Sequence, residues 1–189
     1  MSKAIFWFRN DQRLEDHPAL FEACQLHDEI LYCWIIDDRW QKNYRSLSFP
    51  IMSDVRMQFY QQSIRELTEA LQTRGGQLII RKGEPVDEVL RLANENNIDK
   101  VYASKEAGYY EGRQEKRLAE QIDAHFIDSG SIFDPEKLRV ELGDKSRSFT
   151  SFRKKAEKKL APREAIKQFA LSPSPDTRSS SYEWEDIQC

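Results

Sequence analysis

Short apolar runs alternate with segments of helical periodicity along most of this chain. The runs have the length and the aromatic and β-branched content of strands buried on both faces, and they cover residues 4–8, 29–36, 77–81, 100–104 and 125–128. Between them, apolar positions recur every three or four residues over 18–26, 53–74, from 85 onward and over 109–124. Strands that alternate with helices over connections of this length are parallel and are joined by right-handed crossovers. The pattern predicts a three-layer, Rossmann-like α/β fold: a five-stranded parallel sheet flanked by helices.

Proline, glycine and hydroxyl side chains mark the expected helix ends. Pro18 is expected as the first residue of its helix, because it lacks only an N–H that the first turn leaves unpaired. Ser53 or Asp54 is expected to cap the long helix, which Gly75 and Gly76 end. The later helices present apolar faces that we expect to point inward, and the first of them, on the long helix, we interpret as core and not as a cofactor site. These positions are Met57, Tyr60, Ile64, Leu67 and Leu71, then Val86, Val89, Leu90 and Ala93, then Leu118 and Ile122.

The sequence changes character after residue 133. A polar stretch at 134–148 precedes a predicted helix over 149–160, which Thr150 could cap and whose apolar stripe is Phe149, Phe152, Ala156 and Leu160. From residue 145 to 163, eight Lys and Arg accompany one acidic residue, so this part has a net charge of +7 and the remainder −10 within the total of −3. Residues 170–189 are Ser- and Pro-rich at their start, as a linker or tail is, and we expect them to lie against the body or a neighbouring chain. The predicted divisions are 1–133, an α/β domain; 134–169, a connecting segment with a basic helix; and 170–189, a linker-like tail.

Composition narrows the classes of function. A net charge of −3 in 189 residues gives no overall attraction to nucleic acid. No apolar run approaches the roughly 20 residues that span a bilayer, and no signal-peptide pattern opens the chain. Cys24, Cys33 and Cys189 lack metal-type spacing, and the three histidines are scattered, so we expect free thiols, no zinc site and a cytoplasmic protein.

Charged residues follow the first two predicted strands. Arg9, Asp11, Arg13 and Asp16 come after the first, and Asp37, Asp38 and Arg39 after the second. The carboxyl ends of parallel strands meet at one edge of a sheet, where α/β proteins place their ligands. A second interpretation stays open, since such charges often pair with a neighbouring element and only hold a loop. The first loop contains no glycine, and neither GxGxxG, GxxxxGK[ST] nor a recognisable Ser, His and acid set occurs, which argues against a dinucleotide fold, a P-loop or a triad hydrolase.

Two segments resemble one known family. Residues 6–20, Phe-Trp-Phe-Arg-Asn-Asp-Gln-Arg-Leu-Glu-Asp-His-Pro-Ala-Leu, resemble the amino-terminal signature of the DNA photolyase and cryptochrome family, with Gln12 where that family usually has leucine. Residues 149–157, Phe-Thr-Ser-Phe-Arg-Lys-Lys-Ala-Glu, are similar to the segment that closes the amino-terminal α/β domain of DASH-type cryptochromes. The chain is thus similar to that α/β domain.

The resemblance implies a site for an antenna pigment, methenyltetrahydrofolate or another, in the cleft at the strand carboxyl ends. By motif position, this cofactor-binding site would use Arg9, Asn10 and Asp11 of the first loop, Asp37, Asp38 and Arg39 of the second, and Lys105 and Glu106 after the fourth strand. Lys105 stands where some folate binders have asparagine. Glu106 could equally be a solvated turn residue.

The family's flavin-bearing helical domain has no counterpart in these residues, so FAD is not expected on this chain and deoxyribodipyrimidine photolyase activity is not expected of it alone. Three hypotheses remain. The chain could be a non-catalytic antenna-type domain that binds a pigment, a partner chain or a second copy at the rim. It could be half of a split photolyase completed by a separate flavin-bearing chain. It could also bind nucleic-acid phosphates weakly through Arg153, Lys154, Lys155, Lys158 and Lys159, although a solvated helix face is the alternative for those residues.

Overall fold

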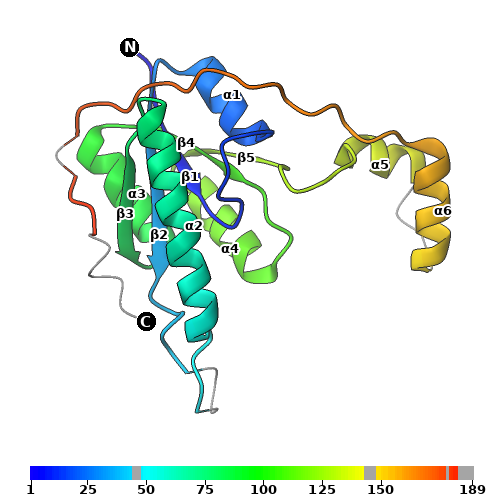
Figure 1. Cartoon of the computed structure of the whole chain (residues 1–189), viewed down its shortest axis with the longest axis horizontal. Coiled ribbons are helices and arrows are strands. Elements are labelled where there is room, and N and C mark those ends of the chain that lie inside the picture. Colours follow the sequence, from blue (N-terminus) through cyan, green and yellow to red (C-terminus); the bar gives the residue numbers. More distant parts are fainter. Residues whose placement is uncertain (44–47, 143–147, 178, 183–189) are drawn as a thin grey trace.

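One parallel sheet forms the centre of the molecule (Figure 1). The computed structural model describes residues 1–43, 48–142, 148–177 and 179–182. Its strands are β1 (Lys3–Phe8), β2 (Glu29–Asp37), β3 (Leu78–Gly83), β4 (Lys100–Ser104) and β5 (Asp123–Ile127). They lie in the order β3-β2-β1-β4-β5 and every neighbouring pair is parallel. The predicted five-stranded parallel α/β fold is confirmed.

Four helices cover the two faces of this sheet: α1 (Pro18–Leu26), α2 (Asp54–Thr73), α3 (Pro85–Asn96) and α4 (Tyr109–Ala119). Two more, α5 (Pro135–Leu142) and α6 (Phe149–Lys159), follow β5 along the chain. Phe6 and Phe8 of β1 belong to a core cluster with side chains of α1 and α2, whereas Ile5 and Trp7 belong to a second cluster with side chains of α3 and α4. Alternate residues of one strand thus face opposite layers, as the pleat of a strand requires.

The helix boundaries follow local chemistry in most places. Pro18 is the first residue of α1, and the ring of His17 caps that helix by accepting from Leu20 N. Ser53 caps α2, and Gly75 after its end has a φ of 81°, a conformation that glycine adopts without steric cost. The part of the chain that the structure describes has no helix long and apolar enough to cross a membrane. Cys24 and Cys33 are free, and Cys189 lies outside the described residues.

Two predictions about the later helices were wrong. The helix predicted over 109–124 ends at Ala119, because residues 123–127 pair along β4 and form β5. Ser148, not Thr150, caps α6, and Phe149 is 75% exposed, so only Ala156 of the predicted stripe is buried. The polar stretch also contains a helix that was not predicted from the sequence, α5, whose first turn is held by Asp134, since its carboxylate accepts from Glu136 N and Lys137 N.

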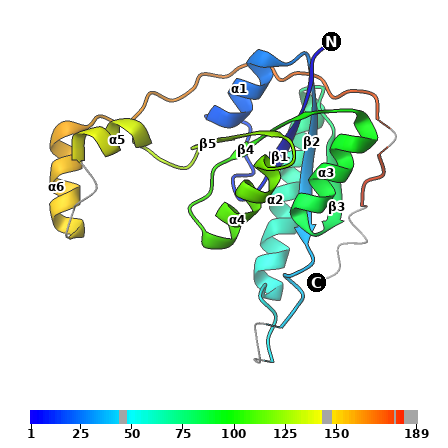
Figure 2. The same ribbon diagram turned by 180° about the vertical axis from the view of Figure 1, so that it is seen from behind.

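The chain leaves the sheet and returns to it. Helices α5 and α6 pack on each other at a distance from the sheet, and both views show them as a projecting arm (Figures 1 and 2). The described residues between 163 and 182, here called the strap, run back across α1 and β2 to the edge strand β3. Phe169 packs edge-on against Phe21, and Tyr32 of β2 donates from its hydroxyl to Ser172 O at 2.6 Å. The tail therefore lies against the body over 170–177 and 179–182.

Candidate functional site

Arg9 directly follows β1, and its side chain turns into the fold. Its guanidinium donates to Glu115 Oε1 at 2.7 Å, Ser104 O at 3.2 Å and Gln114 Oε1 at 3.3 Å. It also lies 4.8 Å from the ring centre of Trp7, and its residue is only 7% exposed. Arg9 thus joins β1 to β4 and α4, and its donors are already committed to protein acceptors.

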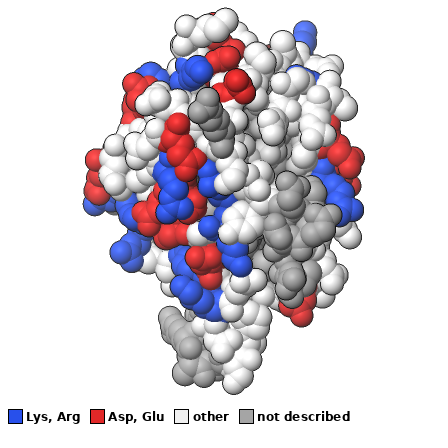
Figure 3. Space-filling model, turned by 90° about the vertical axis from the view of Figure 1, so that its left-hand side faces the viewer, with Lys and Arg blue, Asp and Glu red and all other residues white. Residues whose placement is uncertain are grey.

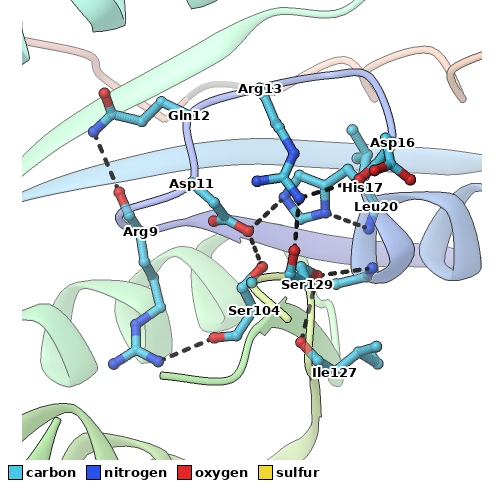
Figure 4. Close-up of polar contacts among 12 residues, drawn as sticks. Arg9, Asp11, Gln12, Arg13, Asp16, His17, Leu20, Ser104, Ile127 and Ser129 are labelled. Carbon is cyan, nitrogen blue, oxygen red and sulfur yellow. Dashed lines mark hydrogen bonds and ion pairs between the residues drawn. The ribbon is translucent and has the colours of Figure 1, made fainter. Parts of the chain in front are cut away.

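Asp11 forms a second buried contact beside it (Figure 4). Ser104 Oγ donates to its Oδ2, and His17 Nε2 lies 3.0 Å from the same oxygen. Burial acts to raise the pKa of Asp11, but the hydrogen bonds and charge of His17, with Ser104, outweigh it and hold the pKa below its usual value. His17 Nδ1 accepts from Leu20 N and its Nε2 faces Asp11, so this Ser, Asp and His set orients the first loop.

Arg13 and Asp16 hold the strap and the segment after β5. Arg13 donates to Ser129 O at 2.6 Å (Figure 4). The Asp16 carboxylate accepts from Ile166 N at 2.9 Å and from Arg163 Nη1 at 2.8 Å, and these contacts lower the pKa of Asp16, the Ile166 N–H first and Arg163 next. Arg9, Asp11, Arg13 and Asp16 are therefore all used in contacts within the fold, as the loop-holding interpretation expects.

Asp37 and Arg39 form a fork at the end of β2. Asp37 is 4% exposed, and it accepts from Arg39 N at 2.8 Å and from Arg39 Nε at 2.9 Å. The pair raises the pKa of Arg39, chiefly through the hydrogen bond to Asp37. The Arg39 guanidinium lies 5.6 Å from the ring centre of Tyr110. Asp38 is exposed, and its N–H donates to Gly83 O.

A cleft of about 400 Å³, here called the aromatic cleft, opens at the carboxyl ends of β1 and β2. Three stacked rings line it. The centres of Trp34 and Tyr60 are 6.0 Å apart, and those of Trp40 and Tyr60 are 5.3 Å apart, with interplanar angles of 29° and 28°. Arg56, in the first turn of α2, lines the same cleft and makes no ion pair with any residue that the structure describes. Planar ligands suit such a lining, because aromatic faces stack on one another.

The predicted site residues divide into two groups. Arg9, Asn10, Asp37 and Arg39 line the aromatic cleft, whereas Asp11, Asp38, Lys105 and Glu106 do not. Lys105 is exposed. Glu106 is half-buried, and burial raises its pKa against the opposing effects of Arg9 and a hydrogen bond with Asn10. The structure thus brings half of the predicted set to one cleft.

Sequence reasoning missed the rings of the cleft. Tyr60 was assigned to the core stripe of α2, and Trp34 to a buried strand. Both assignments are correct as to burial, because these residues are 7% and 2% exposed. A usable signal was the grouping of Trp34, Trp40 and Tyr60 near the strand end and the first turns of the next helix, where each can present a face to a cleft.

The basic residues of α6 form a separate surface on the arm. Lys154, Lys155, Lys158 and Lys159 line a shallow hollow of about 610 Å³. Lys159 pairs with Glu141 at 3.3 Å, and Arg153 pairs with Glu157 at 3.4 Å. The other three lysines have no ion-pair partner within the described ranges.

The fold and the aromatic cleft together define a Rossmann-like α/β domain with a ligand-sized cleft at the strand ends. The chain belongs to the DNA photolyase family, whose model matches residues 4–174, and it corresponds to that family's N-terminal α/β domain. This confirms the resemblance drawn from residues 6–20.

Two curated relatives and one solved structure give the extent of the likeness. Cryptochrome DASH of Idiomarina loihiensis is 34% identical over 157 residues, covering 81% of this chain and 34% of that protein. Deoxyribodipyrimidine photo-lyase of Streptomyces griseus is 31% identical over 122 residues, covering 65% and 26%. The crystal structure of the Synechocystis sp. PCC6803 cryptochrome superimposes with a TM-score of 0.88 and 29% identity, over 100% of this chain and 41% of that one. The chain spans about a third of the length of the first curated relatives that it matches.

Proposed function

We propose that this domain binds a planar, conjugated antenna-type pigment in the aromatic cleft and has no catalytic activity of its own. The observation that supports the proposal is the stacked set Trp34, Tyr60 and Trp40 in a cleft of about 400 Å³. That volume falls within the usual range of small-molecule sites, roughly 300–1,000 Å³. The cleft also lies where α/β sheets bind ligands, at the strand carboxyl ends.

The lining supports the pigment class more directly than it supports folate. Trp40 and Tyr60 would stack on the ring system, and Arg56 would attract an anionic arm, since Arg9 and Arg39 are already paired. Glu106, the position that resembles the family's folate-contacting acidic residue, lies outside the lining, and so does Lys105, which stands where some folate binders have asparagine. A bound pigment would supply light absorption, while the residues of this chain bind it, orient it and exclude water.

Reconstitution in the dark tests this function. Protein purified gently would be incubated with methenyltetrahydrofolate, a deazaflavin or FMN, separated from free ligand and examined by absorption spectroscopy. We expect a band beyond the tryptophan region, with affinity reduced about tenfold or more in Trp40→Ala, because one stacking face is lost. Lys155→Gln, far out on the arm, is the matched control and should bind normally. Absence of uptake of all three ligands by folded protein would contradict the proposal.

A partner chain is the second candidate at the same rim. Large apolar side chains are exposed on the segment before α2, on the first half of α2 and at the start of α4, and these are Phe49, Ile51, Val55, Phe59, Tyr109 and Tyr110. Exposed apolar surface of this kind often marks an interface. A flavin-bearing partner would make this chain half of a split photolyase. Co-elution with a yellow, flavin-containing chain from native extract is expected, and a stable monomer there would argue against it.

Nucleic acid is a third candidate, through α6. Lys154 with Lys158 and Lys155 with Lys159 place like charges four residues apart, an arrangement that costs a helix stability. Phosphates would relieve that repulsion. Reversal of these four lysines to Glu should abolish salt-sensitive retention on duplex DNA, whereas reversal of Lys3, Lys42, Lys105 and Lys137 changes the net charge equally and should spare it. Unchanged retention in the α6 variant would exclude this role.

A further inference from the structure

The outer edge of β3 is occupied by the far end of the strap. β3 is one of the two edge strands of the sheet, and its sequence begins with three apolar residues, Leu78, Ile79 and Ile80. Ile80 N donates to Ser181 Oγ at 3.0 Å, and Tyr182 N donates to Ile80 O at 2.9 Å. Both main-chain groups of Ile80 therefore have partners from a segment about a hundred positions later. An uncovered edge strand with apolar residues is a site where another strand can add, so the strap protects β3 from such pairing.

The strap is fixed at its root and lightly held at its end. Near the root, Ser172 and Pro175 are buried, and Ile30 N of β2 donates to Pro173 O at 3.0 Å. At the far end, Ser180, Ser181 and Tyr182 are exposed, and Ser181 and Tyr182 each make one hydrogen bond to Ile80. The other contacts there are side-chain hydrogen bonds near the surface: Ser179 Oγ donates to Glu95 Oε2 at 2.6 Å and accepts from Asn96 Nδ2 at 3.0 Å, and Arg81 Nη1 donates to Ser180 Oγ at 3.4 Å. Segments with few buried contacts open at low cost while the rest of the fold stays closed. The end can thus leave β3 without the root leaving β2.

We propose that the outer edge of β3 is a strand-addition site, which residues 179–182 occupy within the chain and which a second copy of this chain occupies when they are displaced. Two identical edges can pair about a two-fold axis, in antiparallel fashion. A pairing centred on Ile80 would set Lys82 of one copy beside Leu78 of the other, so no like charges would face each other. Figure 3 shows this side of the molecule, where acidic and basic side chains are interspersed and neither sign dominates the coloured surface.

Two double variants test the proposal. Ser181→Ala with Tyr182→Pro removes both hydrogen bonds to Ile80, since proline has no N–H. Ser180→Ala with Tyr182→Ala is the matched control, because it alters the same segment and keeps both bonds. Sedimentation over a wide concentration range reports association, and hydrogen exchange reports the amides of Ile80 and Ile30. Unchanged protection of Ile30 would show that the root of the strap remains in place.

The expected result has two parts. In dilute solution the Ile80 amide of the first variant should exchange about fivefold to tenfold faster than in the unchanged chain, as the loss of one hydrogen bond implies. At high concentration that variant should form a dimer in which Ile80 regains protection, while the control stays monomeric. A variant that is monomeric at every concentration would overturn the proposal. So would a dimer whose Ile80 amide stays unprotected, or an unchanged chain that dimerises as strongly as the variant.

Discussion

Single charged residues of the first loop each join two or more elements. Arg9 reaches β4 and α4, Asp11 reaches β4 and the cap of α1, and Asp16 reaches the strap. A buried charge without its partner is costly, because the protein interior solvates it poorly. These residues therefore contribute to stability even where they also border a cleft.

Arg9→Gln should lower the free energy of unfolding by about 3–5 kcal/mol, because it leaves Glu115 buried without its cation. Urea denaturation at neutral pH measures this loss. The double variant Arg9→Gln with Glu115→Gln should be less destabilised than the sum of the single variants, since both members of the pair are gone. Lys105→Gln is the exposed control and should change stability by about 0.5 kcal/mol or less. Equal effects of Arg9→Gln and Lys105→Gln would show that the buried pair is not stabilising.

Asp16 makes attachment of the strap dependent on pH. Its pKa is lower in the folded chain than the unfolded value of about 3.9. Its stabilisation is therefore fully present above the unfolded pKa and is lost as the pH falls through the folded one. The Ile166 amide resonance should report this transition in the unchanged chain and lose it in Asp16→Asn. Glu15→Gln, an exposed neighbour, should leave the transition intact, and a transition that persists in Asp16→Asn would refute the assignment.

At the scale of elements, α6 is stabilised mainly by interactions within the helix, such as its cap, and little by burial of its side chains. It lies on the arm, and only Ala156 of its side chains is buried. Ser148→Ala should therefore reduce its helicity, with a loss of about 1 kcal/mol confined to this helix, since the side chain caps Ser151 N. Amide exchange in α6 measures the loss. Thr150→Ala should have little effect, and a larger effect of Thr150→Ala would restore the cap predicted from the sequence.

The sequence was sufficient to predict an element wherever its own apolar periodicity and the residues at its ends determine it. The apolar runs gave the five strands, and Pro18, Ser53 and Gly75 gave helix ends, because each acts through its local conformation. The boundary between α4 and β5 was missed, since pairing with β4 decides it. The cleft was predicted only in part: charges after strands are visible in a sequence, whereas Trp34 and Tyr60 show only that they are buried. The path of the strap left no pattern, because it bonds mostly to main-chain groups.

At the scale of the whole molecule, the strap packs a segment from the end of the sequence against strands from its first half. Tyr32 is fully buried, and its hydroxyl donates to Ser172 O. Tyr32→Phe should lower the free energy of unfolding by about 1–2 kcal/mol, because that carbonyl loses its partner in a buried place. Urea denaturation should show a lower midpoint with an unchanged slope. Tyr110→Phe removes a hydroxyl from an exposed residue and should have little effect. Equal midpoints for the two variants would mean that water replaces the lost bond.

The separation of these contacts along the chain has a consequence during protein synthesis. The contacts of residues 166–182 of the strap with the sheet, with α1 to α3 and with the first loop join residues that are 81 to 150 positions apart, and contacts of long separation form late. A chain made from its amino terminus exposes Ile30, Tyr32 and the apolar start of β3 to its surroundings well before the ribosome has made their partners. Nascent chains with uncovered strand edges are prone to aggregate. The nascent domain therefore passes through an interval in which its sheet can assemble but its edge is unprotected, and shielding by a chaperone has its greatest effect in that interval.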